Sequence, residues 1–245
     1  MDAIPTTEGT LLGGAVSYAQ PASGHRTGIE PVFLAAAVPA HSGERVLEGG
    51  TGAGAGLLCL AHRVHGVTGL GVEIEPAMAG IAAANLAANG RRALTILTGD
   101  VCDMTGAAGE FDHAMANPPW HDAAGSQPPG ALKQRAKMAP AGLAAAWISA
   151  MAKVLRPRGT LTLILPPRMV PESLAALEAA GCGSLLLSPL WPKPGREARI
   201  VLLQAHKGGG GGFRLLPGLV LHGATGGYTD AAEAILRRGA ALPLR

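Results

Sequence analysis

The chain has 245 residues, of which 48% are hydrophobic and 15% charged, and a formal net charge of +3. This length fits one domain with a buried core, and the apolar content excludes an intrinsically disordered chain. Cys59, Cys102 and Cys182 lie far apart without metal-ligand spacing, so we expect reduced thiols and no metal. The N-terminus lacks a signal-peptide pattern, and no apolar run reaches the roughly 18 residues of a membrane span. We therefore expect a cytoplasmic protein without a membrane partner.

Strands and helices alternate along the chain from about residue 44. Strands are predicted over residues 45–48, 66–73, 93–98, 111–116, 160–165, 184–187 and 199–205, and helices over 53–64, 76–89, 143–155 and 171–180. This order predicts an α/β fold with a doubly wound, mostly parallel seven-stranded sheet, Rossmann-like, with helices on both faces. We expect an α/β domain over residues 44–206, preceded by an extension (1–43) and followed by a tail (207–245) that packs on the core.

A glycine-rich turn follows the first predicted strand. It reads Glu48-Gly49-Gly50-Thr51-Gly52-Ala53-Gly54. In a doubly wound sheet this turn lies at the carboxyl end of the strand, where ligands bind at the topological switch point. Glycine lets the backbone approach a ligand closely, and the helix N-terminus behind the turn favours an anionic group. On this motif alone, a tight turn without a ligand stays open.

A second acidic position favours a nucleoside ligand. Glu73 ends the second predicted strand, where a carboxylate can accept hydrogen bonds from both ribose hydroxyls. Glu75 is an alternative, although its position favours the start of the next helix. The spacing Gly-x-Gly-x-Gly, with an acidic residue two positions before, resembles class I S-adenosylmethionine-dependent methyltransferases rather than dehydrogenases. The resemblance implies S-adenosyl-L-methionine as cofactor and S-adenosyl-L-homocysteine as product.

The same resemblance implies which residues contact the cofactor. They lie in the glycine-rich turn, at the ends of the next two strands and at the start of the loop after the fourth: Glu48, Gly50, Thr51, Gly52, Gly54, Glu73, Ile74, Asp100, Val101 and Asn117. Asp100 ends the third predicted strand, where that fold binds the adenine of the cofactor. Taken alone, an aspartate at this place is more often a turn residue.

The fourth predicted strand runs directly into Asn117-Pro118-Pro119-Trp120. Two prolines fix φ, so the Asn117 amide oxygen and the Pro118 carbonyl can be held toward one point. Two acceptors match the two donors of an NH2 group, and binding both turns the nitrogen lone pair toward the methyl donor. Trp120 can stack on a planar acceptor. These four residues are the candidate catalytic residues for methylation of adenine N6, cytosine N4 or glutamine N5.

Other polar residues near this motif are less informative. His113 lies inside the strand and His121 follows the motif, and neither has a metal-ligand partner, so we expect packing or solvent contact. Lys133, Arg135 and Lys137 form a basic run after the loop. The run is either a solvated helix face or a surface that contacts phosphates.

Nearly the whole chain resembles the bacterial tRNA1(Val) (adenine(37)-N6)-methyltransferases, in their alphaproteobacterial form. The matching stretches lie before the first strand, at the cofactor and catalytic motifs, and near the C-terminus. They are Leu11–Gly14, Gln20-Pro21, Arg26–Val32, Gly50–Gly52, Gly71–Glu73, Asn117–Pro119, Leu155–Pro157 and Tyr228-Thr229. Two positions depart from the family pattern: Trp120 stands where tyrosine or phenylalanine is usual, and Glu48 where aspartate is common.

The family resemblance implies adenine N6 beside a tRNA anticodon as acceptor, with RNA as partner. It also implies that Arg26, Thr27 and Gly28 cover the methionine end of the cofactor, so the N-terminal extension contributes to cofactor and substrate cover. Protein glutamine N5-methyltransferases share the catalytic motif and are the alternative. They resemble a core preceded by a helical substrate domain, for which the roughly 44 residues before the first strand leave little room. The oligomeric state, monomer or dimer, stays open.

Overall fold

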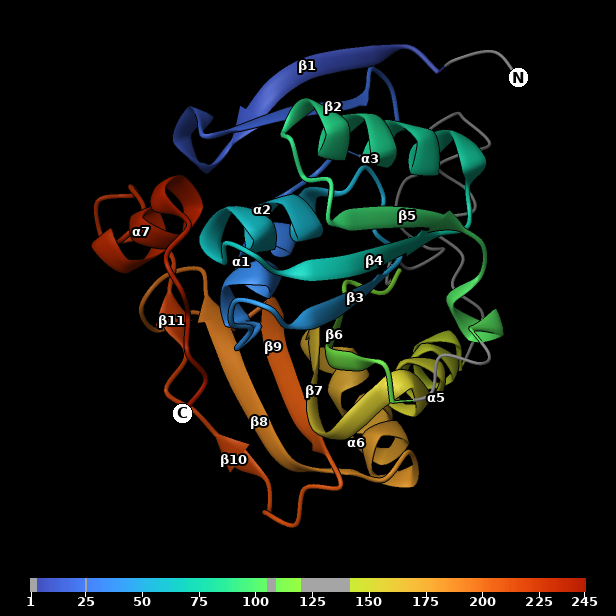
Figure 1. Ribbon diagram of the computed structural model, residues 1–245. Helices are drawn as coiled ribbons and strands as arrows, with labels where there is room; N and C mark the ends of the chain where they lie inside the picture. The colour runs from blue at the N-terminus through green and yellow to red at the C-terminus, as the bar shows by residue number, and fades with distance from the viewer. Residues whose placement is uncertain (1–3, 25, 105–108, 120–141) are drawn as a thin grey trace.

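A nine-stranded sheet lies at the centre of the structure, a computed structural model that describes residues 4–24, 26–104, 109–119 and 142–245 (Figure 1). The strands are β3 Arg45–Gly49, β4 Thr68–Glu73, β5 Leu94–Thr98, β6 Phe111–Ala116, β7 Leu155–Leu165, β8 Cys182–Trp191, β9 Ile200–Lys207, β10 Arg214–Leu215 and β11 Leu219–Val220. Their order is β10-β8-β9-β7-β6-β3-β4-β5, and β11 also pairs with β8. Of these strands only β9 runs antiparallel to its neighbours. The predicted α/β fold with a mostly parallel, doubly wound sheet is confirmed.

Helices cover both faces of the sheet. They are α1 Glu30–Ala37, α2 Ala55–Arg63, α3 Pro76–Ala88, α5 Leu143–Val154, α6 Val170–Ala179 and α7 Asp230–Arg238. The buried side chains form two clusters, one that joins α1, α2, α3 and α7 to the sheet and one that joins α5 and α6 to its other face. Neighbouring residues of a strand point to opposite faces, so Val46 belongs to the first cluster and Leu47 to the second. Burial on both faces explains why the central strands are continuous apolar runs.

Two strands are longer than the sequence pattern predicts. β7 begins at Leu155, directly after α5, and its register with β6 shifts before Thr160. Pro157 and Gly159 lie in this irregular stretch, which explains why the pattern indicates a strand only from residue 160. β8 continues through Pro189, which lies between the part of β8 that pairs with β10 and the part that pairs with β11. A proline is tolerated there because its missing N–H is not needed for either pairing.

The two terminal segments, for which the sequence predicts no elements, also carry secondary structure. Residues 1–43 contain a hairpin of β1 (Thr6–Leu11) and β2 (Val16–Pro21), joined by the 3-10 turn η1 (Leu12–Gly14), and then α1. The hairpin lies along α3, at the top of Figure 1. The C-terminal segment adds β10 and β11 to the edge of the sheet and places α7 near α1 and η1.

All three cysteines are free. Within the described ranges, His, Cys, Asp and Glu form no group of three that could hold a metal ion. No helix of this part of the chain is long and apolar enough to cross a membrane.

Candidate active site

The glycine-rich turn joins β3 to α2 at the carboxyl edge of the sheet. Gly50, Gly52 and Gly54 have φ of 64°, 57° and 86°, a left-handed region that glycine adopts without strain. The Gly-x-Gly-x-Gly spacing is therefore required by the path of the backbone. Side-chain space is also limited, because a Cβ at Gly50 would lie 2.5 Å from the ring of Trp147 on α5. The sequence predicts glycines here because they let the backbone approach a ligand closely. The structure adds a second reason at Gly50, which is the room that the Trp147 ring needs.

Glu48 is buried beneath the turn. The residue is 4% exposed, and its Oε2 accepts hydrogen bonds from the hydroxyl of Thr51 and, at 3.1 Å, from the backbone N–H of Leu57. A Cβ at Gly56 would clash with Glu48 Oε1, so glycine at that position leaves room for the carboxyl group. The side chain thus links the end of β3 to the first turn of α2. Direct contact between Glu48 and the cofactor stays a prediction.

Burial raises the pKa of Glu48 to about 7, although the hydrogen bonds from Thr51 and Leu57 lower it, and the nearby Glu73 raises it further. The value of an unperturbed glutamate is 4.5. Between about pH 4.5 and pH 7, Glu48 therefore holds a proton in the folded protein that it has lost in the unfolded chain. The stabilising contribution of the neutral carboxyl is complete below about pH 4.5 and is lost as the pH rises through about 7.

We expect Glu48→Gln to reduce the pH dependence of stability. The glutamine keeps a neutral acceptor for Thr51 and Leu57 but has no proton to lose. Between about pH 5 and pH 8, the cofactor-free wild type should lose about 2–3 kcal/mol more unfolding free energy than the variant. Urea unfolding at both pH values measures this difference. Equal losses in the two proteins would show that Glu48 does not titrate in this range.

Glu73 ends β4 beside the same turn. It is 8% exposed; Oε2 accepts the N–H of Gly52 at 2.9 Å, and Oε1 accepts the N–H of Glu75 at 3.0 Å. An ionised carboxylate has about four acceptor positions, so these two bonds leave capacity for hydroxyl donors of a ligand. The bond to Gly52 also ties the glycine-rich turn to the next strand of the sheet.

The ends of β4 and β5 are joined by a hydrogen bond from the N–H of Gly99 to the carbonyl of Glu73, at 2.9 Å. The predicted cofactor residues Ile74, Asp100 and Val101 follow these two strand ends. Ile74 is 61% exposed, whereas Val101 is buried. Asp100 Oδ1 accepts the backbone N–H two residues on, at 2.8 Å, and so caps a short 3-10 turn. An exposed apolar side chain beside two carboxylates fits a nucleoside, which has an apolar face and hydroxyl donors. The individual contacts of these residues stay predictions.

We expect Glu73→Ala to weaken binding of S-adenosylmethionine and S-adenosylhomocysteine by about 10- to 100-fold, because a hydrogen bond to a charged group contributes roughly 1.5–3 kcal/mol. Glu73→Gln keeps an acceptor for Gly52 and should lose less. Glu75→Ala is the matched control and should bind nearly as the wild type does. Calorimetric titration of the three folded variants decides between the two acidic positions. Undiminished affinity of Glu73→Ala would remove Glu73 from the site.

Two asparagines, one in the last turn of α3 and one directly after its end, hold the N-terminal hairpin against this site. Asn85 accepts the N–H of Ala19 and donates to its carbonyl, both at 2.8 Å. Asn89 makes the same pair of bonds with Ser17, at 3.0 and 2.7 Å. The two amides thus pair with alternate residues of β2 as a neighbouring strand would. Asn85 also donates to the carbonyl of Ala53 at 2.9 Å, so one side chain joins the hairpin to the glycine-rich turn.

The segment after β2, expected to cover the cofactor, is bound to the hairpin. Thr27 donates its N–H to Gln20 Oε1 at 3.0 Å, and its hydroxyl lies 2.6 Å from the Tyr18 hydroxyl. Arg26 and Gly28, one on each side of Thr27, are both exposed. The structure therefore gives Thr27 a fixed position through β2, and the cofactor contacts of all three residues stay predictions.

Three residues that shape this site are not predicted from the sequence: Tyr18, Asn85 and Trp147. Burial raises the pKa of Tyr18 to about 12, with a contribution from the carboxylate of Glu48, so the phenol stays protonated beside the turn. The chain has only three tryptophans and two tyrosines, which could have drawn attention to each of them. Asn85 and Asn89 were also visible as polar residues four apart in an alanine-rich helix.

We expect Asn85→Ala to destabilise the protein by about 2–4 kcal/mol, because the part-buried backbone of Ala19 and the buried carbonyl of Ala53 lose their partner. Asn89→Ala should cost less, since its bonds to Ser17 are exposed. Denaturant unfolding compares the two variants. Equal losses would contradict a special role for the bond to the glycine-rich turn.

The candidate catalytic loop begins beside this turn. In the register of β3 with β6, Gly49 lies opposite Ala116, so Asn117 follows directly next to Gly50. β4 and β5 lie beyond β3, and β7 lies beyond β6, which makes this pair the switch point of the sheet. Asn117 is half-buried and Pro118 is buried. Trp120, His121, Lys133, Arg135 and Lys137 lie outside the described residues.

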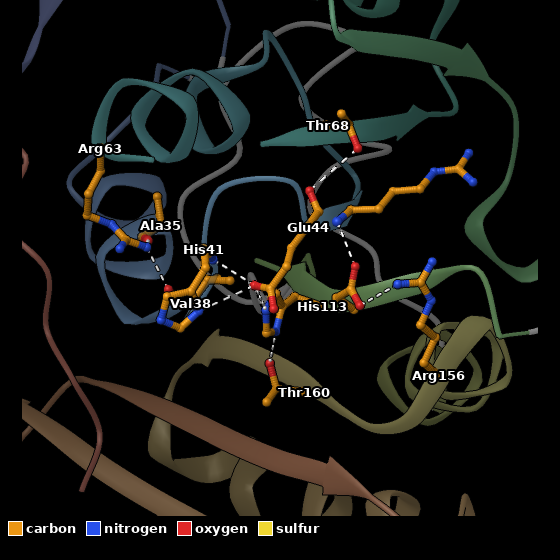
Figure 2. A network of polar contacts seen from close by, with 11 residues as sticks. Ala35, Val38, His41, Glu44, Arg63, Thr68, His113, Arg156 and Thr160 are labelled. Carbon is orange, nitrogen blue, oxygen red and sulfur yellow. Dashed lines mark hydrogen bonds and ion pairs between the residues drawn. The ribbon is translucent and has the colours of Figure 1, made fainter. Parts of the chain in front are cut away.

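His113 lies near the opposite edge of the sheet, within β6. Figure 2 shows its ring between Glu44 and Thr160, with 2.9 Å from Nε2 to Glu44 Oε2 and 2.7 Å from Nδ1 to Thr160 Oγ1. Burial lowers the pKa of His113, although Glu44 raises it. A neutral ring that donates from Nε2 and accepts at Nδ1 satisfies both neighbours. Nearby, Asp112 accepts from Arg156 at 2.6 Å. His113 is therefore a packing residue, as predicted.

Comparison with known proteins supports the methyltransferase interpretation of this geometry. Residues 46–159 match the family model described as a methyltransferase domain. This part of the chain is a methyltransferase domain. S-adenosylmethionine is its methyl donor. The matched range contains the glycine-rich turn, Glu73, Asp100 and Asn117.

Solved structures with the same fold include several methyltransferases. A predicted O-methyltransferase from Agrobacterium tumefaciens is 25% identical, with a TM-score of 0.72 over 87% of this chain and 98% of that one. The tRNA (m1A58) methyltransferase of Aquifex aeolicus is 17% identical, with a TM-score of 0.55 over 78% and 72%. A geranyl diphosphate C-methyltransferase from Streptomyces coelicolor, with S-adenosyl-L-homocysteine bound, is 12% identical, with a TM-score of 0.51 over 72% and 74%. A search of curated proteins finds no match.

Proposed function

We propose that this methyltransferase modifies the exocyclic N6 amino group of adenine in RNA, in the first place in tRNA next to the anticodon. The position of Asn117 and Pro118 carries the proposal. They follow β6 directly beside the glycine-rich turn, at the switch point of the sheet. The polar groups that would bind the acceptor therefore begin where the methyl donor is expected.

The residues of the site fit the donor. The left-handed turn offers backbone close to a ligand, and the carboxylate of Glu73 has acceptor capacity for ribose hydroxyls. When bound, S-adenosylmethionine supplies an electrophilic methyl group and leaves as S-adenosylhomocysteine. In this proposal Thr27 and its neighbours cover the methionine end of the cofactor from the side of the hairpin.

The task of the catalytic loop follows from the chemistry of the acceptor. The lone pair of adenine N6 is delocalised into the ring, so the nitrogen is a poor nucleophile. The Asn117 amide oxygen and the Pro118 carbonyl would accept its two N–H groups and thereby direct the lone pair toward the methyl group. Pro118 and Pro119 keep these acceptors in place because their φ angles are fixed. Placement and polarisation are the main effects, and no strong base is required.

Two other methyl acceptors, a glutamine amide and a hydroxyl oxygen, are compared with the adenine amino group. A protein glutamine also presents a planar NH2 group and is the alternative acceptor. The description of the A. tumefaciens relative indicates an oxygen acceptor. Two converging acceptor oxygens match an NH2 group, which has two donors, better than a hydroxyl, which has one. This match favours an amino group over a hydroxyl as the acceptor.

The acceptor can be identified directly. Purified protein, tritiated S-adenosylmethionine and total RNA from a strain that lacks the gene should give labelled RNA, and nucleoside mass spectrometry should identify N6-methyladenosine. Total protein from the same strain is the parallel substrate. Labelled glutamine in protein, or a methyl group on a ribose oxygen, would overturn the proposal.

We expect Asn117→Ala to reduce single-turnover methyl transfer by about 10²–10³-fold, because one preorganised polar partner of the reacting group is lost. Its affinity for S-adenosylmethionine should stay close to that of the wild type. Trp120→Ala should impair acceptor engagement, whereas Trp120→Phe should keep much of the activity because a stacking surface remains. Cofactor titrations on the same variants are the control. Near-normal methyl transfer by Asn117→Ala would refute an amino-group methyltransferase.

A further inference from the structure

The loop between β8 and β9 carries a concentration of positive charge. Residues 192–199 include three exposed cations, Lys193, Arg196 and Arg199, and one exposed anion, Glu197. The N–H of Arg196 donates to the carbonyl of Lys193 at 3.1 Å. The turn that this bond closes fixes the spacing of the first two cations. The loop is thus a short, locally ordered segment with an excess of positive charge.

The strand pairing places this loop at the same edge of the sheet as the catalytic loop. Ala116, which precedes Asn117, lies opposite Leu163 of β7, and Leu163 lies opposite Leu203 of β9. β9 is thus two strand spacings from β6, about 10 Å. Ile200 begins β9 three residues before Leu203, so the loop that leads into it lies toward the carboxyl edge. A polymer bound at Asn117 can therefore reach the loop without crossing the sheet.

An aromatic pair lies next to the cationic loop. The N–H of His222 donates to the carbonyl of Pro192, the first residue of the loop, at 3.1 Å. The rings of His222 and Tyr228 are stacked, with 4.5 Å between centroids and 21° between planes. Tyr228 is nevertheless 36% exposed. Phosphate-binding cations beside an accessible aromatic ring are the two elements with which proteins bind unpaired nucleic acid.

We infer that residues 192–199 together with His222 and Tyr228 form a second RNA-binding surface, here called the β8–β9 surface. It binds backbone phosphates through its three cations and stacks one unpaired base on Tyr228. The inference rests on the proposed function, because it takes the acceptor to be RNA. It adds a contact outside the methylation site, which lets the enzyme hold a folded RNA while one adenine enters the site.

The test compares two triple variants of equal charge change. K193A/R196A/R199A removes the cations of the β8–β9 surface. R92A/K153A/R214A removes one lysine and two arginines that are exposed elsewhere: Arg92 and Lys153 precede β5 and β7, at the amino edge, and Arg214 lies on β10. The probe is a fluorescent anticodon stem-loop RNA, titrated with cofactor-free protein between about 50 and 200 mM salt.

Each lost phosphate contact lowers the slope of log affinity against log salt by about 0.7–0.9. Over this salt range the wild type and the control variant should therefore lose about 20- to 40-fold more affinity than K193A/R196A/R199A. Tyr228→Ala should weaken binding about tenfold, whereas Tyr228→Phe should bind as the wild type does. In turnover, K193A/R196A/R199A should raise KM for RNA and leave kcat and cofactor affinity unchanged.

The possible outcomes separate this inference from the proposed function. If the wild type forms N6-methyladenosine in RNA but K193A/R196A/R199A keeps its salt slope and its KM, the β8–β9 surface is refuted and the function stands. If the wild type neither binds nor methylates RNA, both are refuted. A normal cofactor titration shows that each variant is folded, so loss of RNA binding cannot be ascribed to unfolding.

Discussion

The buried carboxyl group of Glu48 constrains the rest of the site. Taking a carboxyl group out of water is costly, and in the described residues hydrogen-bond donors, rather than an ion pair, offset this cost. Those donors, the Thr51 hydroxyl and the Leu57 N–H, lie on either side of the turn, so the chain must fold back over the end of β3 to supply them. The left-handed glycines allow that path, and Gly56 leaves space for the carboxyl group. The turn predicted to bind a ligand therefore also supplies the hydrogen bonds of a buried carboxyl group.

The glycine-rich turn and the candidate catalytic loop lie next to one another only because of the order of the strands in the sheet. β3 and β6 are separated in the sequence by two strands and two helices, yet Gly49 and Ala116 are opposite one another in the sheet. The donor turn and Asn117 consequently start from adjacent points of a rigid framework. Asn85 extends the same framework outward, because its amide holds both the carbonyl of Ala53 and the backbone of β2. Hydrogen bonds of this side chain thus position the hairpin relative to the turn, together with the burial of Val16 and Tyr18 of β2 in the core.

Much of the core could be predicted from the sequence, because strands buried on both faces are apolar runs and the helices between them are marked by glycine and proline. The prediction was weaker where tertiary pairing overrides local preference. β8 passes through Pro189 because its two outer partners leave that residue unpaired, and neither β10 nor β11 has a pattern of its own in two residues. The strand-like pairing of Asn85 and Asn89 was missed for the same reason: an asparagine in a helix shows what it binds only when the neighbouring strand is in place.

The two edges of the sheet differ in how they use polar groups. At the amino edge, both ring nitrogens of His113 are bonded, and Asp112 is bonded on both oxygens, by Arg156 and by the backbone of Arg45. These bonds tie the starts of β3, β6 and β7 to one another. At the carboxyl edge, the carboxylate of Glu73 serves two backbone donors and keeps acceptor positions, and an isoleucine beside it stays 61% exposed. The amino edge thus uses its polar side chains to join neighbouring strands, whereas the carboxyl edge places a carboxylate next to an exposed apolar side chain, a combination that suits a nucleoside.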